Sequence, residues 1–249
     1  MCRGGASAPS NPVRRTKKSA DYKIIASCVL SQNVFRDKKY KNIIKRRKKV
    51  ETKKPIKIIL EVPTLILVIG TPGCGKTVLS LGFYDDNGIK KENGSLDFLS
   101  AFYINKDDIN DGFSAERTGE HYSSVVRKGT YDAIDNIIRH NLKLNNSIWV
   151  DATYWTEVKN PDWAYRYLLM VQQYNYKLKI IRCVSQESII KERLIKRGYS
   201  RDRYKLENWE KFIKDEPIYL DVPYGGMILD RSDSNLKKDV SLALNFLQE

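Results

Sequence analysis

The sequence predicts an α/β fold of three layers, in which a mainly parallel five-stranded sheet lies between helices. Three observations lead to this prediction. Short apolar runs typical of buried strands recur along the chain. Longer segments with apolar residues at helical spacing separate these runs, and this alternation is typical of a parallel sheet. The large positive charge is confined to the beginning of the chain, so the remainder has the balanced composition of a globular domain.

Five segments have the composition of strands. Thr64–Ile69 is an unbroken apolar run that ends at a glycine, as expected for a strand buried on both faces. Four further segments follow it with β-branched or aromatic residues, at 101–105, 147–151, 178–184 and 227–230.

Helical patterns lie between the predicted strands. Apolar residues from Val125 to Leu142 fall on one helical face, a second helix is expected around Ile189–Leu194, and a C-terminal helix around Leu242–Leu247. Residues 85–99 contain two Asn-Gly pairs, which favour turns, so we expect a loop there.

The charge divides the chain into two parts. Residues 1–57 carry 18 Lys and Arg against 3 Asp and Glu, whereas residues 58–249 carry 26 against 27. We therefore predict a basic, disordered N-terminal tail over 1–57 and a folded domain over 58–249. The tail is compatible with a solvated extension, a misassigned start, an arm that attracts nucleic acid, or a targeting sequence.

Cysteine usage and hydropathy bear on the compartment. The four cysteines are too scattered for a disulfide framework, which fits a reducing environment. No run of apolar residues is long enough to cross a bilayer. We expect an intracellular, cytoplasmic protein without a membrane partner.

A phosphate-binding loop follows the first predicted strand. The pattern GxxxxGK[ST] begins at Gly70 and ends at Thr77, after a buried strand and before a helix, as its mechanism requires. Glycines let backbone amides turn inward around phosphate oxygens, and the helix beginning near Lys76 directs its free N–H groups to the same place. We expect Lys76 to reach the β- and γ-phosphates and the Thr77 hydroxyl to ligate Mg²⁺. The predicted nucleotide-binding residues are Gly70, Thr71, Pro72, Gly73, Cys74, Gly75, Lys76 and Thr77.

Carboxylates stand at the ends of two predicted strands. Asp107 and Asp108 follow the second strand and Asp151 ends the third, where ligands of an open parallel sheet bind. A carboxylate there can accept the proton of a hydroxyl nucleophile or help to hold Mg²⁺. Asp107 and Asp108 also suit the first turn of a helix, and Asp151 a turn.

A basic segment follows the fourth predicted strand by one helix. It contains Arg193, Arg197, Arg201 and Arg203, and persistently charged guanidinium groups suit a transferring phosphoryl group. The alternative is a solvated helix face with ion pairs.

The region from about residue 62 resembles the P-loop kinases of the polynucleotide 5′-hydroxyl kinase type, a group that includes AAA-type ATPase-like and zeta-toxin-like kinases. Four segments carry this resemblance in order: IGTPGCGKT, FYINKDDIN, IWVDAT and ERLIKRG. The resemblance implies a P-loop NTPase fold with strand order 2-3-1-4-5 and a helical lid, so 58–249 would be a P-loop kinase domain. It also implies that Asp107 is the general base, that Asp151 and Thr77 organise Mg²⁺, and that Arg193 and Arg197 grip phosphates.

One residue departs from the family pattern. Family members place an arginine three residues after the base, where it contacts the substrate, but this chain has Asn110. Because asparagine carries no charge, it cannot neutralise a substrate phosphate.

We therefore expect an ATP-dependent kinase that uses Mg²⁺ and transfers the γ-phosphoryl group to an alcohol. The leading acceptor is a polynucleotide 5′-hydroxyl, with the tail and lid as nucleic-acid contacts. A small-molecule or nucleotide-sugar kinase is the alternative, and a nucleotide-binding NTPase or switch without a phosphoryl acceptor is a third interpretation. The identity of the acceptor, the base preference and the oligomeric state lie beyond the sequence.

Overall fold

The computed structural model describes residues 56–58, 60–84, 89–90, 96–114, 118–154 and 157–249. All of these belong to a compact unit that spans Thr52–Glu249. The predicted tail lies outside the described residues, apart from its last two positions, which form part of strand β1, Ile56–Ile58. The division into a tail and a kinase domain at residues 57 and 58 stays a prediction.

A five-stranded parallel sheet is the centre of this unit, as predicted. Its order is β5-β6-β2-β7-β8, and every neighbouring pair is parallel. Numbered along the chain, this order is 2-3-1-4-5, so the expected strand order is confirmed. The strands are β2 (Thr64–Ile69), β5 (Phe102–Asn105), β6 (Ile148–Asp151), β7 (Lys177–Val184) and β8 (Met227–Asp230).

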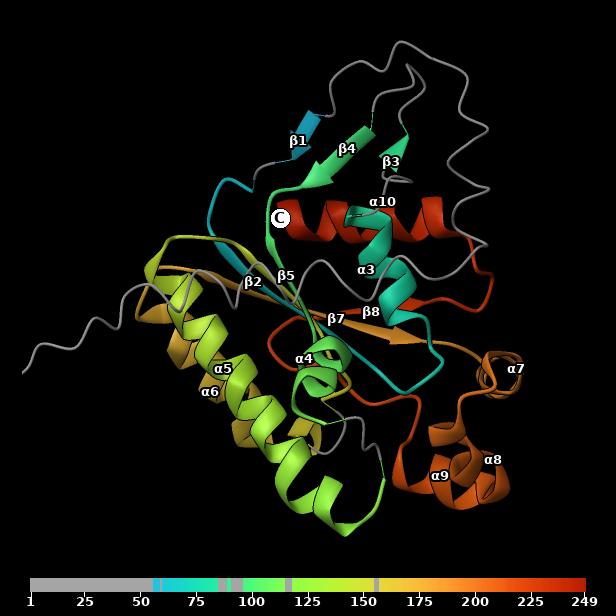
Figure 1. Ribbon diagram of the computed structural model, residues 1–249. Helices are drawn as coiled ribbons and strands as arrows, with labels where there is room; N and C mark the ends of the chain where they lie inside the picture. The colour runs from blue at the N-terminus through green and yellow to red at the C-terminus, as the bar shows by residue number, and fades with distance from the viewer. Residues whose placement is uncertain (1–55, 59, 85–88, 91–95, 115–117, 155–156) are drawn as a thin grey trace, which may run out of the picture. The chain divides into compact units, whose positions relative to one another are not determined.

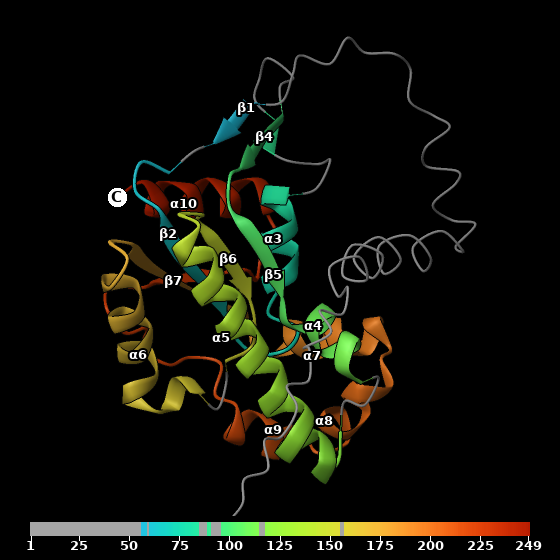
Figure 2. The ribbon, with the colours of Figure 1, turned by 60° about the vertical axis from the view of Figure 1, so that its left-hand side comes forward.

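Helices cover both faces of the sheet (Figures 1 and 2). On one face lie α5 (Arg127–Lys143) and α6 (Pro161–Gln172), and on the other α3 (Lys76–Tyr84) and α10 (Leu236–Gln248). Alternate residues of β2 enter the two cores: Ile66 and Val68 pack with the α3 side, and Leu65 and Leu67 with the α5 side. The unbroken apolar run in the sequence reflects this burial on both faces.

Shorter elements gather beyond the carboxyl ends of the strands. Helix α4 (Lys106–Phe113) follows β5 directly, a π-helical turn η1 (Tyr122–Val126) leads into α5, and η2 (Glu157–Lys159) precedes α6. The lid segment, residues 187–215, contains α7 (Glu187–Arg197), η3 (Ser200–Asp202), α8 (Arg203–Glu207) and α9 (Trp209–Asp215). No helix in the described part of the chain is long and apolar enough to cross a membrane.

Two local expectations were wrong. Residues 85–99 are not wholly loop, because β3 (Ile89–Lys90) and β4 (Leu96–Leu99) pair there and β1 joins β4 in a separate three-stranded sheet. Asn-Gly pairs favour strand-connecting turns as well as loops, and the sequence analysis missed the short strands beside them. The helical face also does not include Val125, which is exposed, since the π-helical turn shifts the pattern and buries Val126 instead.

Trp149 of β6 offers a test of the α3-side core. Its ring lies 4.8 Å from that of Phe83, and its indole N–H donates to Ser80 Oγ at 2.9 Å. Trp149→Ala should lower the free energy of unfolding by about 3–5 kcal/mol, because it removes a fully buried aromatic side chain. Urea unfolding measures this loss, and Tyr219→Ala, at an exposed ring, should change stability by less than about 0.5 kcal/mol. Equal effects of the two substitutions would contradict this packing.

Candidate active site

The phosphate loop connects β2 to α3 along a path that glycine makes possible. Gly70, Gly73 and Gly75 all have positive φ values, of 139°, 87° and 98°. A Cβ atom on Gly70 would lie 2.3 Å from the carbonyl oxygen of Cys183, a backbone atom of the neighbouring strand β7. The loop therefore passes too close to the sheet for any side chain at this position.

Three consecutive carbonyls of the loop are bound by side chains from distant segments. Arg193 Nη1 donates to Gly73 O at 3.3 Å, and Ser185 Oγ donates to Cys74 O at 3.3 Å. Arg231 Nη1 donates to Gly75 O at 2.9 Å. In a planar trans peptide the C=O and the N–H point in opposite directions. Hydrogen bonds that hold these three carbonyls therefore direct the N–H groups of the following residues away from the bonded side chains. The loop is thus held in the form that a phosphate requires.

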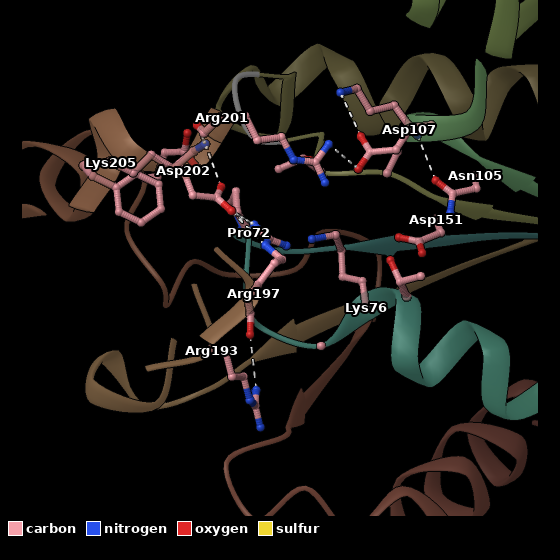
Figure 3. A pocket seen from close by; sticks show the side chains of 18 of the residues that line it. Pro72, Lys76, Asn105, Asp107, Asp151, Arg193, Arg197, Arg201, Asp202 and Lys205 are labelled. Carbon is pink, nitrogen blue, oxygen red and sulfur yellow. Dashed lines mark hydrogen bonds and ion pairs between the residues drawn. The ribbon is translucent and has the colours of Figure 1, made fainter. Parts of the chain in front are cut away.

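Lys76 begins α3 and is buried at the centre of the loop (Figure 3). Its ammonium group donates to the carbonyls of Gly70 and Thr71 at 2.8 and 3.1 Å. These bonds hold the amine over the loop that the sequence analysis assigned to phosphate binding. A lysine at this position supplies the positive charge that phosphate oxygens need.

Asp151 ends β6 directly beside the loop. In the sheet it is paired with Val68 of β2 and Asn105 of β5, so its position is fixed from both sides. The carboxylate is buried, accepts a hydrogen bond from Tyr103 OH at 3.4 Å and is hydrogen bonded to Thr77. Burial raises the pKa of Asp151, and the nearby Lys76 opposes that rise.

The oxygens of Thr77 and Asp151 have the chemistry that Mg²⁺ prefers. No group of three or more His, Cys, Asp or Glu that could hold a metal occurs among the described residues. A cation here would therefore take its other ligands from phosphates and water, which is usual for Mg²⁺. The donor set of this pair and the cradle of the loop fit Mg²⁺ with a nucleoside triphosphate.

Asp107 lies in the first turn of α4, above the phosphate loop. Asn105 caps this helix, since its side chain accepts from the Asp107 N–H at 2.8 Å. The Asp107 carboxylate forms an ion pair with Arg201 at 2.9 Å and a longer one with Lys106 at 3.4 Å (Figure 3). Asp107 lines the main pocket, whereas Asp108 is exposed and does not.

The lid arginines differ in their surroundings. Within the described part of the chain, Arg193 donates hydrogen bonds to the body of the domain: besides Gly73 it donates to Ser185 Oγ, Arg231 O and Ser234 Oγ. In Figure 3 Arg193 extends away from Asp107, while Arg201 extends towards it. These contacts favour a positioning role for Arg193, in contrast to the direct grip on phosphate that the resemblance implied.

Arg197 is oriented by a buried carboxylate. Its Nε donates to Asp202 Oδ2 at 2.8 Å, and its Nη2 lies 2.6 Å from the same oxygen. Asp202 is only 1% exposed and also binds Lys205 at 3.3 Å. Two guanidinium nitrogens thus contact a single carboxylate oxygen, which orients the guanidinium. Arg197 and Arg201 both line the pocket, so the structure brings them to the same cavity as Lys76 and Asp107.

The pocket between the loop, α4, α5 and the lid segment has a volume of about 830 Å³. It gathers every predicted catalytic and metal-binding residue: Lys76, Thr77, Asp107, Asp151, Arg193 and Arg197. That volume lies within the usual range of ligand sites in proteins.

Asn110, the departure from the family pattern, does not reach this pocket. It is fully buried, its Nδ2 donates to Ser114 O at 3.1 Å, and its Oδ1 accepts from Thr130 Oγ1 at 3.4 Å. The position therefore joins α4 to α5 and offers nothing to a ligand.

Several pocket residues were missed by the sequence analysis. Arg231 follows β8 and is buried, with an ion pair to Asp239 at 3.0 Å in addition to its bond to the loop. A cation directly after the last predicted strand was a signal that could have found it. Arg127 and Glu216 also line the pocket, but no motif marks them. Lys106, another lining residue, lies within the segment FYINKDDIN, but no role was predicted for it.

Comparison with known proteins places the chain in a family. Residues 65–215 match the model of the AAA domain family. The chain belongs to this family. No curated protein matches the sequence of this AAA-domain protein.

Solved structures share the fold of the AAA-domain protein. A provisionally named kinase from Chloroflexus aurantiacus has a TM-score of 0.55 and 17% identity, over 76% of this chain and 100% of that one. A sugar kinase from Janibacter has a TM-score of 0.51 and 13% identity, over 75% of this chain and 94% of that one. An APS kinase from Mycobacterium tuberculosis, solved with AMPPNP and APS, has a TM-score of 0.50 and 11% identity, over 76% of this chain and 99% of that one. At these identities the likeness shows that the AAA-domain protein has a P-loop kinase fold.

The burial of Asp151 gives a prediction for metal binding. Asp151→Asn should abolish the Mg²⁺ dependence of nucleotide binding, because an amide is a far weaker ligand than a carboxylate. The raised pKa means that the ionised carboxylate costs stability at neutral pH, so the metal-free variant should melt at a higher temperature than the wild type. Calorimetric titration with and without Mg²⁺, and thermal melting, measure the two effects. Unchanged Mg²⁺ dependence would remove Asp151 from the metal site.

Proposed function

We propose that this protein is an ATP-dependent phosphotransferase that moves the γ-phosphoryl group of ATP to a hydroxyl. The observation that carries the proposal is the ion pair between Asp107 and Arg201 across the pocket, with Lys76 beneath it. This arrangement combines a base for a hydroxyl, a cation for the phosphoryl group and a loop for the remaining phosphates.

In the proposed reaction Asp107 takes the proton of the acceptor hydroxyl. The acceptor oxygen forms a bond to the γ-phosphorus as the bond from that phosphorus to the β–γ bridging oxygen breaks, and ADP leaves. Lys76, Arg197 and Arg201 offset the negative charge spread over the phosphoryl oxygens. Thr77 and Asp151 would hold Mg²⁺, which would offset negative charge on the phosphates.

The acceptor proposed from the sequence is a polynucleotide 5′-hydroxyl, with a small alcohol or nucleotide sugar as the alternative. Two observations favour the alternative. Asn110 is buried against α5, and Arg127 binds both carboxylate oxygens of Glu157, at 2.8 and 2.9 Å. A nucleic-acid phosphate would have to compete with Glu157 for Arg127.

An NTPase or switch without an acceptor is the remaining hypothesis. It does not require a carboxylate such as Asp107 in the same pocket as the phosphate loop. A transfer screen with radiolabelled γ-phosphate over oligonucleotides, tRNA and small alcohols separates these possibilities. Release of inorganic phosphate alone, with every acceptor class, would reject the phosphotransferase.

Asp107→Asn should lower the rate of phosphoryl transfer by about 10²–10⁴-fold, the usual loss for a general base. The substitution keeps the size of the side chain, so ATP affinity should change little. Asp108→Asn is the matched control, since Asp108 is exposed outside the pocket, and it should have a mild effect. Single-turnover transfer measures both variants. A greater loss of transfer rate in Asp108→Asn than in Asp107→Asn would show that Asp107 is not the base.

A further inference from the structure

The pocket contains charges of both signs. Its lining includes Lys106, Tyr122, Arg127, Tyr131 and Glu216, and we call these five residues the acceptor subsite. They come from α4, η1, α5 and the residue after α9. Of these five, only Lys106 lies in a motif found in the sequence, FYINKDDIN.

The two cations of the acceptor subsite already have partners. Lys106 is mostly buried, and its ammonium contacts Asp107 Oδ1 at 3.4 Å and Tyr122 OH at 3.2 Å. Arg127 is held by both oxygens of Glu157 and lies over the ring of Tyr131, 5.2 Å from its centre. An anionic ligand would therefore gain little from these groups unless an internal ion pair broke.

Glu216 is different, because one oxygen of its carboxylate is unsatisfied. Its Oε2 atom is buried and has no hydrogen-bond partner among the described residues. Burial raises the pKa of Glu216, while cations that include Lys205, Lys76 and Arg127 oppose the rise. A buried acceptor without a donor is destabilising, and a ligand hydroxyl can supply the missing donor.

The backbone around Glu216 is fixed on both sides. The Glu216 N–H donates to Phe212 O at 2.8 Å, which completes the end of α9. The next two carbonyls, of Pro217 and Ile218, accept bonds from the buried Arg182 of β7 at 3.1 Å each. Lys159 of η2 donates to the carbonyl of Asp215. Glu216 is thus mounted on a rigid framework, as a binding residue needs to be.

We propose that Glu216 binds the acceptor and that the acceptor is a neutral, polyhydroxylated small molecule. The inference rests on the proposed phosphotransferase function. Hydroxyl groups can donate to Glu216 and accept from Lys106, and the rings of Tyr122 and Tyr131 offer faces to carbon–hydrogen surfaces. An anionic group placed beside the Glu216 carboxylate would be repelled by it and could not donate the missing hydrogen bond.

Two pairs of probes, each differing only by one anionic group, test the proposal. Thymidine and thymidine 3′-monophosphate share the same 5′-hydroxyl, and myo-inositol is compared with myo-inositol 1-phosphate. Each is titrated calorimetrically into the full chain saturated with Mg²⁺ and a non-hydrolysable ATP analogue. The neutral member of at least one pair should bind, and about tenfold more tightly than its anionic counterpart.

Glu216→Gln should reduce this discrimination to about threefold or less while leaving the affinity for the ATP analogue unchanged. Glu210→Gln is the matched control, since Glu210 is an exposed residue of the preceding helix α9 outside the pocket, and its discrimination should equal that of the wild type. Thermal melting of both variants checks that they fold.

Three results would overturn the inference: tighter binding of the anionic members, unchanged discrimination in Glu216→Gln, or no binding of either neutral probe. Failure of the proposed function itself looks different. In that case the ATP analogue does not bind, or no acceptor of any class receives the γ-phosphate in the transfer screen.

Discussion

The peptide groups of the phosphate loop can turn their amides towards a phosphate only if their carbonyls are bonded elsewhere. Arg193, Ser185 and Arg231 supply these bonds to three consecutive carbonyls, and each of the three lies after the end of β7 or β8. The parallel direction of the strands makes this possible, because it brings their carboxyl ends to one edge of the sheet. Loop geometry is therefore a property of the whole sheet edge.

At the same edge of the sheet, the carboxylate proposed for Mg²⁺ and the carboxylate proposed as the base lie in different places. Asp151, locked between β2 and β5, stands beside the phosphate loop, while Asp107 begins the helix after β5 and faces the lid. Buried Asp202 orients Arg197, and Asp107 pairs with Arg201, so two arginines of one lid are held by two different carboxylates. Movement of the lid segment would exchange the Asp107–Arg201 ion pair for contacts between Arg201 and the transferring phosphoryl group.

Much of the fold could be predicted because the informative signals are local. The apolar run of β2, the glycine spacing of the loop and the acid after β6 each occupy a few consecutive residues. The roles of Arg231, Asn110 and Glu216 could not be found in this way. Arg231 binds a loop far from it in the chain, Asn110 is buried by α5, and Glu216 lines the pocket beside a segment whose carbonyls Arg182 binds. These are tertiary contacts, and no periodicity in one sequence encodes them.

The family and the fold do not by themselves require that the loop bind a triphosphate, so the central claim is best tested by titrating Mg-ATP into the wild type and into Lys76→Ala. Lys76 is buried over the loop, and its charged hydrogen bonds to phosphate should each be worth about 1.5–3 kcal/mol. The account predicts one binding site in the wild type and an affinity about 10- to 100-fold weaker in the variant, with both proteins folded. Equal affinities in two folded proteins would contradict it.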